Sequence, residues 1–485
     1  MDMITMPAVN IAPILPEILL SVLGMVLLLL NVFTPDAKRS VLGYISLIGL
    51  IATGVVICSG WGTHIESFSG SVVLDNFASF FKLIFLVAAG LAILISDQYM
   101  EREGCNHGEL YPVILFTVVG MMLMASGTDL MTIFLGLEVM SVSLYILAGF
   151  NRANAKSNEA GLKYFLLGAF STGFLLYGMA LTYGATGTTR VLGIASAVGK
   201  MTMPSTNIML VAGMLLMLTG FAFKIAAAPF HMWTPDVYEG APTPMTAFMS
   251  AGPKAAGFAA ALRIFLVCLP TLQVEWSQVL WVLAVLTMTV GNITALKQDN
   301  IKRMLAYSSI AHAGYALVGF TAGNGTGAAG ILFYMLSYAF MNIGAFAIII
   351  LIGKKGETNG NVQDFAGFGS RHPVLAAAMT IFLFSLAGMP PTAGFIGKFY
   401  LFSGAVQNGY VWLAIIGVLN SAASVYYYLR VMVYMYMKDP TEEFDWMKVT
   451  APMALCVLIS VIGSLIPGIV PSVILQFAQE AVKLI

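Results

Sequence analysis

Four charged residues lie inside long apolar stretches of this chain: Glu138, Lys224, Lys254 and Lys398. Lys254 lies roughly 16 Å into its apolar run at 1.5 Å per residue, and Glu138 lies about 12 Å into its own. An unpaired charge at such depth in a membrane costs several kcal/mol, so each residue needs a partner or water. Burial and a neighbouring carboxylate change the proton affinity of a lysine in opposite directions. These residues therefore suit proton uptake and release; the alternative is a static ion pair between Glu138 and one lysine that locks helix packing.

His312 adds a group that titrates near neutral pH and can pass a proton between its two nitrogens. It lies within the segment Tyr307-Ser308-Ser309-Ile310-Ala311-His312-Ala313-Gly314-Tyr315, where hydroxyl groups surround it at helical spacing. This environment suits a proton relay. A single helical histidine is also often a hydrogen-bonded packing element, and the sequence leaves both interpretations open.

Further basic residues lie nearer the ends of apolar stretches. We expect Lys82, Arg263 and Arg430 to extend their charged heads to the membrane surface while their stems stay in the apolar layer. Lys163 follows a loop by only a few residues, but it could face inward beside Glu138. It is therefore an additional candidate for the proton site.

No residue pattern predicts a cofactor, a metal ion or a nucleic acid as a ligand. The four cysteines are isolated, without a Cys-x-x-Cys pair that could hold an iron–sulfur cluster or zinc, and the five histidines are equally scattered. Residues 325–330 match the dinucleotide pattern G-x-G-x-x-G but lack the strand that this pattern requires. A net charge of zero argues against nucleic-acid binding.

The elements that position the candidate residues are membrane-spanning helices. Of the 485 residues 59% are hydrophobic and 9% charged, against about 25% charged in soluble domains, and the mean hydropathy is +0.88. A helix needs about 20 apolar residues to cross a membrane, and about fourteen such runs recur. The sequence predicts an all-α integral membrane protein with these spans: residues 12–33, 41–60, 75–97, 110–127, 130–149, 160–184, 208–230, 243–269, 276–296, 304–322, 326–352, 372–405, 410–437 and 449–470.

Basic residues are distributed unevenly between alternate loops, and basic loops stay on the cytoplasmic side. One side carries only Arg190, Lys200 and, in the tail, Lys483. This distribution predicts that both chain ends lie outside and favours an even number of crossings. The predicted cytoplasmic residues are Lys38, Arg39, Arg102, Arg152, Lys156, Lys297, Lys302, Arg303, Lys354, Lys355, Arg371, Lys438 and Lys448.

The seventh and twelfth expected spans each contain proline close to a lysine. Pro229 follows Lys224, and Pro390 and Pro391 precede Lys398. Interrupted helices are tolerated at membrane depth only beside protein or a water-filled cavity, and paired interruptions are typical of internally repeated transporters. We therefore expect two inverted-topology five-helix repeats with discontinuous helices 7 and 12. The expected domains are residues 1–109 (helices 1–3), 110–269 (helices 4–8), 270–437 (helices 9–13) and 438–485 (helix 14 and tail).

Four segments carry recognisable motifs around the candidate residues, namely residues 134–138, 220–242, 300–312 and 394–400. Together they resemble the antiporter-like membrane subunits of proton-pumping NADH:quinone oxidoreductase, respiratory complex I, in the right order across nearly the whole chain. The motif Trp233-Thr234-Pro235-Asp236-Val237-Tyr238 and the lysine at Lys398 look most like the branch called subunit N, or subunit 2 in organelles.

The resemblance implies a role for each candidate residue. Glu138 would modulate the proton affinity of Lys224, and Lys254 would link onward. His312 and neighbouring hydroxyl groups would carry the central path, and Lys398 would exchange protons with the far side of the membrane.

The resemblance also implies that quinone reduction elsewhere in a complex drives proton transfer in this chain, which itself performs no redox chemistry. FMN, iron–sulfur clusters and quinone are then expected in partner subunits. The expected partners are other membrane subunits, including sister antiporter-like subunits, and the lipids of a bacterial inner (plasma) membrane. A subunit of a cation/proton antiporter, which shares the fold and many motifs, and a structural membrane scaffold are the alternatives.

Overall fold

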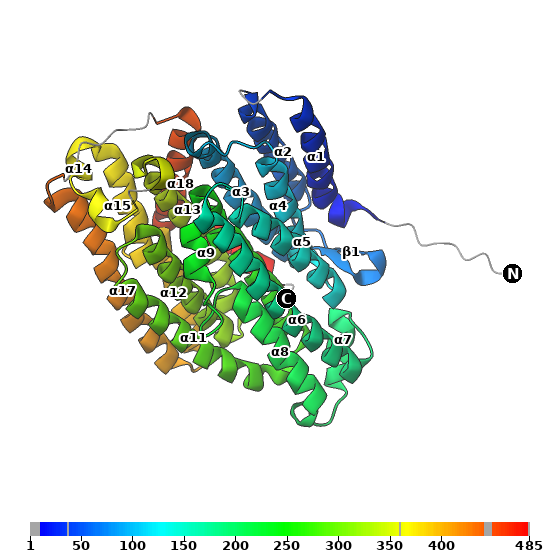
Figure 1. Ribbon diagram of the computed structural model, residues 1–485. Helices are drawn as coiled ribbons and strands as arrows, with labels where there is room; N and C mark the ends of the chain where they lie inside the picture. Colours follow the sequence, from blue (N-terminus) through cyan, green and yellow to red (C-terminus); the bar gives the residue numbers. More distant parts are fainter. Residues whose placement is uncertain (1–9, 36–37, 358–359, 441–448, 484–485) are drawn as a thin grey trace.

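The computed structural model describes residues 10–35, 38–357, 360–440 and 449–483, and this part of the chain is nearly all helical (Figure 1). The long helices run side by side in one bundle. Among the described residues the only strands form one short antiparallel hairpin, β1 (Ile65–Ser67) and β2 (Val72–Leu74), with Ile65 opposite Leu74. The predicted all-α class is therefore confirmed.

The helices follow one another along the chain with short connections. The first three are α1 (Leu15–Phe33), α2 (Ser40–Ser59) and α3 (Asn76–Glu103). The next are α4 (Leu110–Ser126), α5 (Leu130–Ala148), α6 (Ala155–Thr186), α7 (Val191–Gly199), α8 (Ile208–Lys224), α9 (Thr234–Gly240) and α10 (Thr243–Leu262), which continues as a π-helical turn (Arg263–Cys268). Then come α11 (Gln273–Ala295), α12 (Ile301–Ala322), α13 (Gly325–Ile352), α14 (Phe368–Arg371), α15 (Pro373–Ala387), α16 (Ala393–Gln407), α17 (Val411–Met437), α18 (Ala451–Ile469) and α19 (Ser472–Val482).

The helices have the length and composition of membrane spans. Within the described residues, 10 helices are long and apolar enough to cross a membrane, and three more apolar helices, α4, α8 and α15, are shorter. α8 and α15 are short because each is the first part of an interrupted span, which α9 and α16 continue after a non-helical segment. Every expected span falls on a helix, whereas α7, α9, α14 and α19 lie outside the expected spans.

Some helices approach each other closely where glycine faces glycine. A Cβ added to Gly136 of α5 would lie 2.8 Å from the carbonyl oxygen of Gly120 on α4. A Cβ on Gly178 of α6 would likewise lie 2.8 Å from the carbonyl oxygen of Gly213 on α8. Lipid tails are as apolar as leucine, so helices in a membrane associate through such close packing rather than through hydrophobic exclusion. These glycines therefore set the spacing of the helices that carry the candidate residues.

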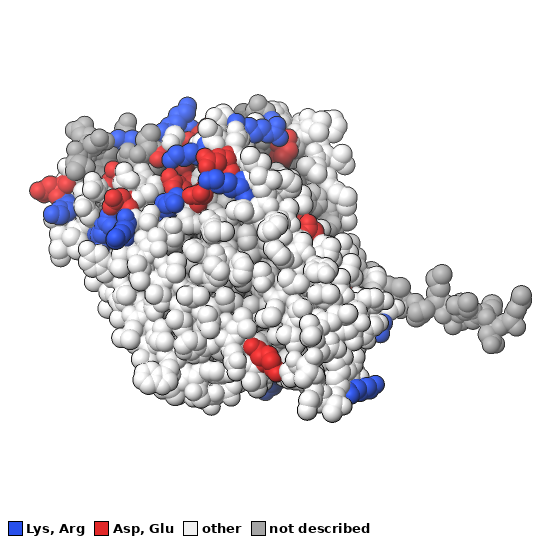
Figure 2. Space-filling model, turned by 60° about the horizontal axis from the view of Figure 1, so that its bottom comes forward, with Lys and Arg blue, Asp and Glu red and all other residues white. Residues whose placement is uncertain are grey.

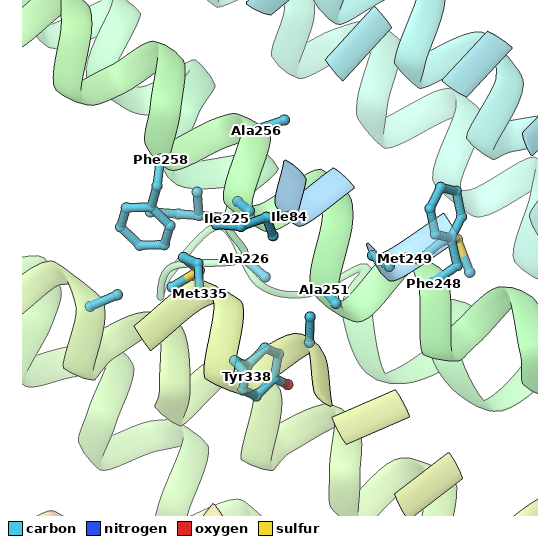
Figure 3. Packing of buried hydrophobic residues seen from close by; sticks show 14 of the residues in the cluster. Ile84, Ile225, Ala226, Phe248, Met249, Ala251, Ala256, Phe258, Met335 and Tyr338 are labelled. Atoms are coloured by element: carbon cyan, nitrogen blue, oxygen red, sulfur yellow. The ribbon is translucent and has the colours of Figure 1, made fainter. Parts of the chain in front are cut away.

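The chain between α8 and α9 is non-helical, and its first four residues, 225–228, are buried. Ile225 and Ala226 lie among apolar side chains that include Phe258 of α10 (Figure 3). The freed backbone groups find partners, since the amide of Ala228 donates to the hydroxyl of Thr287 on α11 at 2.9 Å. An interruption at this depth is stable because protein rather than lipid surrounds it.

Two basic residues that we expected at the membrane surface are instead buried in ion pairs. Lys82 of α3 is fully buried, with its Nζ 2.7 Å from a carboxylate oxygen of Glu17 on α1. Arg263, at the end of α10, lies 3.0 Å from Asp75, the N-cap residue of α3. The expectation was wrong for both, because acids from distant helices neutralise these charges inside the protein. Arg430 does lie near a loop, where it pairs with an exposed carboxylate.

Charged side chains are concentrated at one end of the face shown in Figure 2. Below them a wide band is almost free of Lys, Arg, Asp and Glu, as a surface in contact with lipid requires. Of the predicted cytoplasmic residues, Lys448 lies outside the described residues.

Breaking the buried pair between α1 and α3 should destabilise the protein. Lys82→Ala leaves the Glu17 carboxylate buried without its ammonium, which costs about 3–5 kcal/mol. The double variant Glu17→Gln/Lys82→Met removes both charges and should retain most of the stability. Thermal denaturation of the purified protein measures both losses. Equal losses in the two variants would contradict the importance of the unpaired charge.

Candidate functional site

Lys224 is the last residue of α8, where the interrupted span begins. Its side chain is 4% exposed, and Nζ donates a hydrogen bond to the hydroxyl of Ser141 on α5 at 2.7 Å. The aromatic ring of Tyr145, one turn further along α5, lies 5.8 Å from the ammonium. A neutral hydroxyl and a ring face thus hold this charge in place of a carboxylate.

Glu138 lies one helical turn before Ser141 on α5. The residue is partly exposed, between Leu135 and Val142, which are 58% and 50% exposed. Its Oε1 is a buried atom without a hydrogen-bond partner in the described part of the chain. No ion pair joins Glu138 to a lysine among the described residues, so the static pair considered above does not form in this structure.

Lys254 lies on α10 with 3% of its surface exposed. Its Nζ donates to the hydroxyl of Ser309 on α12 at 2.5 Å and to the backbone carbonyl of the same residue at 2.7 Å. One turn later on α10, a Cβ added to Gly257 would lie 3.8 Å from the Cβ of Lys224. α10 therefore contacts the end of α8 on one side and α12 on the other.

His312 lies on α12, one turn after Ser309, and is 2% exposed. Its Nδ1 is 2.5 Å from the hydroxyl of Tyr334 on α13, and its Nε2 is 3.0 Å from the hydroxyl of Tyr428 on α17. The Tyr428 hydroxyl is also 2.5 Å from the hydroxyl of Ser308. Both ring nitrogens thus contact a group that can donate or accept a proton, which is the arrangement a relay needs.

Lys398 lies on α16, just after the interruption of the second broken span. Its Nζ donates to the last carbonyls of α15, those of Leu386 and Ala387, at 3.0 Å each, and to the hydroxyl of Ser421 at 2.9 Å. The C-terminal end of a helix carries partial negative charge, which favours an ammonium. Gly388, with φ +83°, caps α15 beneath this side chain, and a Cβ there would lie 3.1 Å from Nζ. Glycine is required at this position both by its conformation and by the space that Lys398 occupies.

The structure brings these residues into one row across the bundle. Ser308 and Ser309 are adjacent on α12, so the contacts of Lys254 and His312 meet at one turn of that helix. The ring of Tyr315 lies 4.6 Å from the ammonium of Lys398 and has its centroid 5.7 Å from that of His312. The order is therefore Glu138, Lys224, Lys254, His312, Lys398. We call these five residues the charge row.

The sequence indicated Ser308 and Ser309 beside His312, but it did not reveal the other residues that connect the row. Ser141, Tyr334 and Tyr428 are neutral and lie far along the chain from the groups they contact. One signal could have identified Tyr334: Tyr334, Tyr338 and Asn342 recur at spacings of four residues along an otherwise apolar helix, and so they share one face.

Lys163, the additional candidate, lies in a charged surface cluster. Its Nζ is 2.7 Å from carboxylate oxygens of both Glu159 and Asp236. Arg303 at the start of α12 pairs with Asp236 at 2.9 Å and with Glu239 at 3.0 Å. The structure thus brings Lys163 together with these acids rather than with Glu138.

A second polar cluster surrounds Glu357 in the loop after α13. Its Oε2 lies 2.8 Å from Nζ of Lys302, and its Oε1 accepts hydrogen bonds from the hydroxyls of Tyr99, at 2.5 Å, and Thr243. Burial acts to raise the pKa of Glu357, but the charge of Lys302 and the hydrogen bonds from Lys302, Thr243 and Tyr99 outweigh it, so this pKa lies below its ordinary value. The carboxylate joins α3, α10 and α12 to the loop.

Comparison with known proteins places the charge row within a described family region. A family described as NADH:quinone oxidoreductase/Mrp antiporter, TM matches residues 127–424, which include all five members. NADH-quinone oxidoreductase subunit N of Trichlorobacter lovleyi is 74% identical over 477 residues, covering 98% of each chain. NADH-quinone oxidoreductase subunit N 1 of Solibacter usitatus is 43% identical over 468 residues, covering 96% of each chain.

Solved structures share the fold over nearly the whole length. A chain of respiratory complex I from Thermus thermophilus with bound aureothin is 33% identical, with a TM-score of 0.81 over 95% of this chain and 99% of that chain. A chain of the Mrp complex from Dietzia has a TM-score of 0.83 over 97% of this chain and 96% of that chain. At 19% identity, the second likeness shows the fold alone.

Acidification should release the loop that carries Glu357. A carboxylate whose folded-state pKa lies below its ordinary value contributes stability that is fully present at neutral pH and is lost as the pH falls through the folded pKa, below about 4.5. Hydrogen exchange of residues 353–357, corrected for the intrinsic effect of pH, should therefore accelerate only at acid pH. Glu357→Gln should exchange at the faster rate already at neutral pH. An acid transition that persists in this variant would assign the effect to another group.

Proposed function

Because this chain belongs to the subunit N family of NADH-quinone oxidoreductases, we propose that it translocates protons as a membrane subunit of that multi-subunit complex. Quinone reduction elsewhere in the complex would supply the energy. The observation that carries the proposal is the charge row itself, since each buried lysine in it is held by hydroxyl or carbonyl oxygens and can lose its proton without leaving a carboxylate unpaired.

The proposed path runs along the charge row. Glu138 acts on Lys224 through space, and Ser141, one turn further along α5, accepts a hydrogen bond from Lys224. Lys254 passes a proton to the hydroxyl of Ser309. From this turn of α12 the hydroxyl of Ser308 passes a proton to Tyr428, and Tyr428 passes one to His312. A hydroxyl that accepts a proton from one neighbour releases its own to the next, so charge moves while each group stays in place.

Lys398 is the last member of the row and the proposed site of exchange with the far side. A cavity of about 730 Å³ adjoins it between α16 and α17, lined by Gly388, Phe399 and Ser421 among others. Between His312 and Lys398 the only polar group in contact with both is Tyr315 among the described residues, so water is needed to complete this step.

The two repeats of the proposed architecture divide this work. Residues 110–269 contain Glu138, Lys224 and Lys254, and residues 270–437 contain His312 and Lys398. Equivalent positions support the division, since α8 and α15 are each the first part of a broken span with a lysine at the interruption. Residues 1–109 and 438–485 would then supply the additional helices around the repeats.

We propose that redox chemistry takes place only in partner subunits, which would hold FMN, iron–sulfur clusters and quinone. The scattered cysteines and histidines support this assignment. The uneven distribution of basic loop residues supports an orientation in the bacterial inner membrane with both termini outside. The shared fold of the Mrp complex makes cation/proton antiport the second candidate function, and the high identity to subunit N relatives favours the first.

Removing either of the first two members of the charge row should abolish pumping. Lys224→Ala or Glu138→Ala in the assembled complex should reduce proton pumping to background and coupled turnover by at least about tenfold, because a lost proton-transfer group slows a reaction by about 10²–10⁴-fold. Lys297→Ala, which removes an exposed lysine at the end of α11, is the matched control. Acidification of membrane vesicles with NADH measures pumping. Unchanged pumping and turnover in both variants would refute the relay.

Lys254→Arg separates proton transfer from charge pairing. Arginine keeps the positive charge beside Ser309 but does not readily release its proton. Pumping should therefore be lost although the complex still assembles, as native gel electrophoresis of the membranes can establish. Lys297→Arg serves as the control for the same substitution at an exposed site. Normal pumping by Lys254→Arg would mean that the position requires only a charge.

A further inference from the structure

A line of hydroxyl groups runs along α10 from its first residue to Lys254. Thr243, Thr246, Ser250 and Lys254 are spaced by three or four residues, so they share one face of the helix, and all four are buried. The line is about 16 Å long at 1.5 Å per residue. It leads from the Glu357 cluster to the middle of the charge row, and no step of the relay described above uses it.

A second polar line on α13 faces the first. Tyr334, Tyr338 and Asn342 are buried at spacings of four residues, and Asn342 donates a hydrogen bond to the hydroxyl of Ser250 at 2.5 Å. Tyr338 lies opposite Ala251 of α10 in Figure 3. The two lines therefore meet at Ser250, about one helical turn before Lys254.

Two polar atoms between these lines have no partner. The hydroxyl of Tyr338 and the Oδ1 of Asn342 are buried and make no hydrogen bond in the described part of the chain. A buried polar atom without a hydrogen bond is unfavourable, and buried water is the usual partner for such groups. This unused hydrogen-bonding capacity marks a place for water between α10 and α13.

The outer end of the line opens into a polar cavity. The cavity has a volume of about 260 Å³ and is lined by Arg102, Lys156, Glu239, Thr243, Lys302 and Glu357 among others. Since one water in the liquid takes about 30 Å³, several fit. Glu357 lies at the boundary, because its Oε1 accepts the hydroxyl of Thr243, the first group of the line.

We propose that this line is the path by which protons reach Lys254 from the side of the basic loops. The hydrogen bond between Ser250 and Asn342 lies on this path, where the two polar lines meet. The proposal rests on the proposed function. A proton enters from water in the cavity, and each hydroxyl or water that accepts a proton releases one inward, until Lys254 takes it up. Glu357 is a positioning residue: its negative charge attracts protons to the cavity and its Oε1 orients Thr243. Lys302 from α12 and Tyr99 from α3 face it and keep it ionised.

The test uses the complete complex in inverted membrane vesicles. Asn342→Leu removes the amide nitrogen that donates to Ser250 and the unpaired Oδ1, and Glu357→Gln removes the negative charge at the cavity. Each should lower proton pumping and coupled turnover by on the order of tenfold at mildly alkaline pH, where protons are scarce, and much less at mildly acidic pH. Glu357→Asp should restore most of the activity. A merely structural role would lower turnover by the same factor at every pH.

Glu159→Gln is the matched control, because it removes a carboxylate that is 61% exposed and paired to a lysine at 2.7 Å outside the line. Its pH profile should equal that of the unchanged complex. If Asn342→Leu and Glu357→Gln pump normally at all pH values while Lys254→Arg does not, the path is wrong and the proposed function stands. If all three pump normally, the proposed function itself fails.

If a variant does not assemble, the proposed path can still be tested by looking for its water directly. A high-resolution structure of the unchanged complex should show ordered water within hydrogen-bond distance of the Tyr338 hydroxyl and Asn342 Oδ1. A dry contact between α10 and α13 at these atoms would overturn the proposal.

Discussion

The chemistry of this bundle depends on what holds each buried ammonium. Lys224, Lys254 and Lys398 are held by hydroxyl groups and backbone carbonyls. Lys82, equally buried, lies 2.7 Å from the carboxylate of Glu17. Removing a proton from Lys82 would leave a bare negative charge in a poorly solvated place, whereas the other three can become neutral beside neutral groups. Similar lysines in one protein therefore suit different purposes: Lys82 holds two helices together, whereas the other three can exchange protons as the proposed function requires.

The interrupted helices follow from the same constraint. Inside a continuous helix each carbonyl already accepts a hydrogen bond from an amide of the same helix, whereas the last carbonyls of a helix have no such partner. The end of α15 leaves the carbonyls of Leu386 and Ala387 free for Lys398, and Gly388 leaves room for the ammonium. The glycine contacts between α4 and α5 keep the helix that carries Glu138 and Ser141 close to its neighbour. Close packing and local loss of helix thus cooperate in positioning charge.

The sequence predicted the spans well because membrane thickness fixes the length of an apolar run. It also predicted that Lys224, Lys254 and Lys398 lie within helical spans, and all three are buried. It did not predict their partners: Ser141 lies 83 residues from Lys224 and Tyr428 lies 116 residues from His312. The expectation for Lys82 and Arg263 failed for the same reason, because Glu17 and Asp75 look like ordinary helix-end acids until the fold brings them to α3 and α10.

His312 contacts a tyrosine hydroxyl at each ring nitrogen, at 2.5 and 3.0 Å. A neutral imidazole carries one N–H, so at any moment the ring donates one of these two hydrogen bonds and accepts the other. The hydrogen bonds along the row therefore share one donor-to-acceptor direction, and each proton that passes along them would reverse it. A second proton cannot follow in the same direction until the ring or the hydroxyls have turned back. In the proposed relay this centre would therefore transmit protons one at a time, and the rate of this resetting would limit how fast the row conducts.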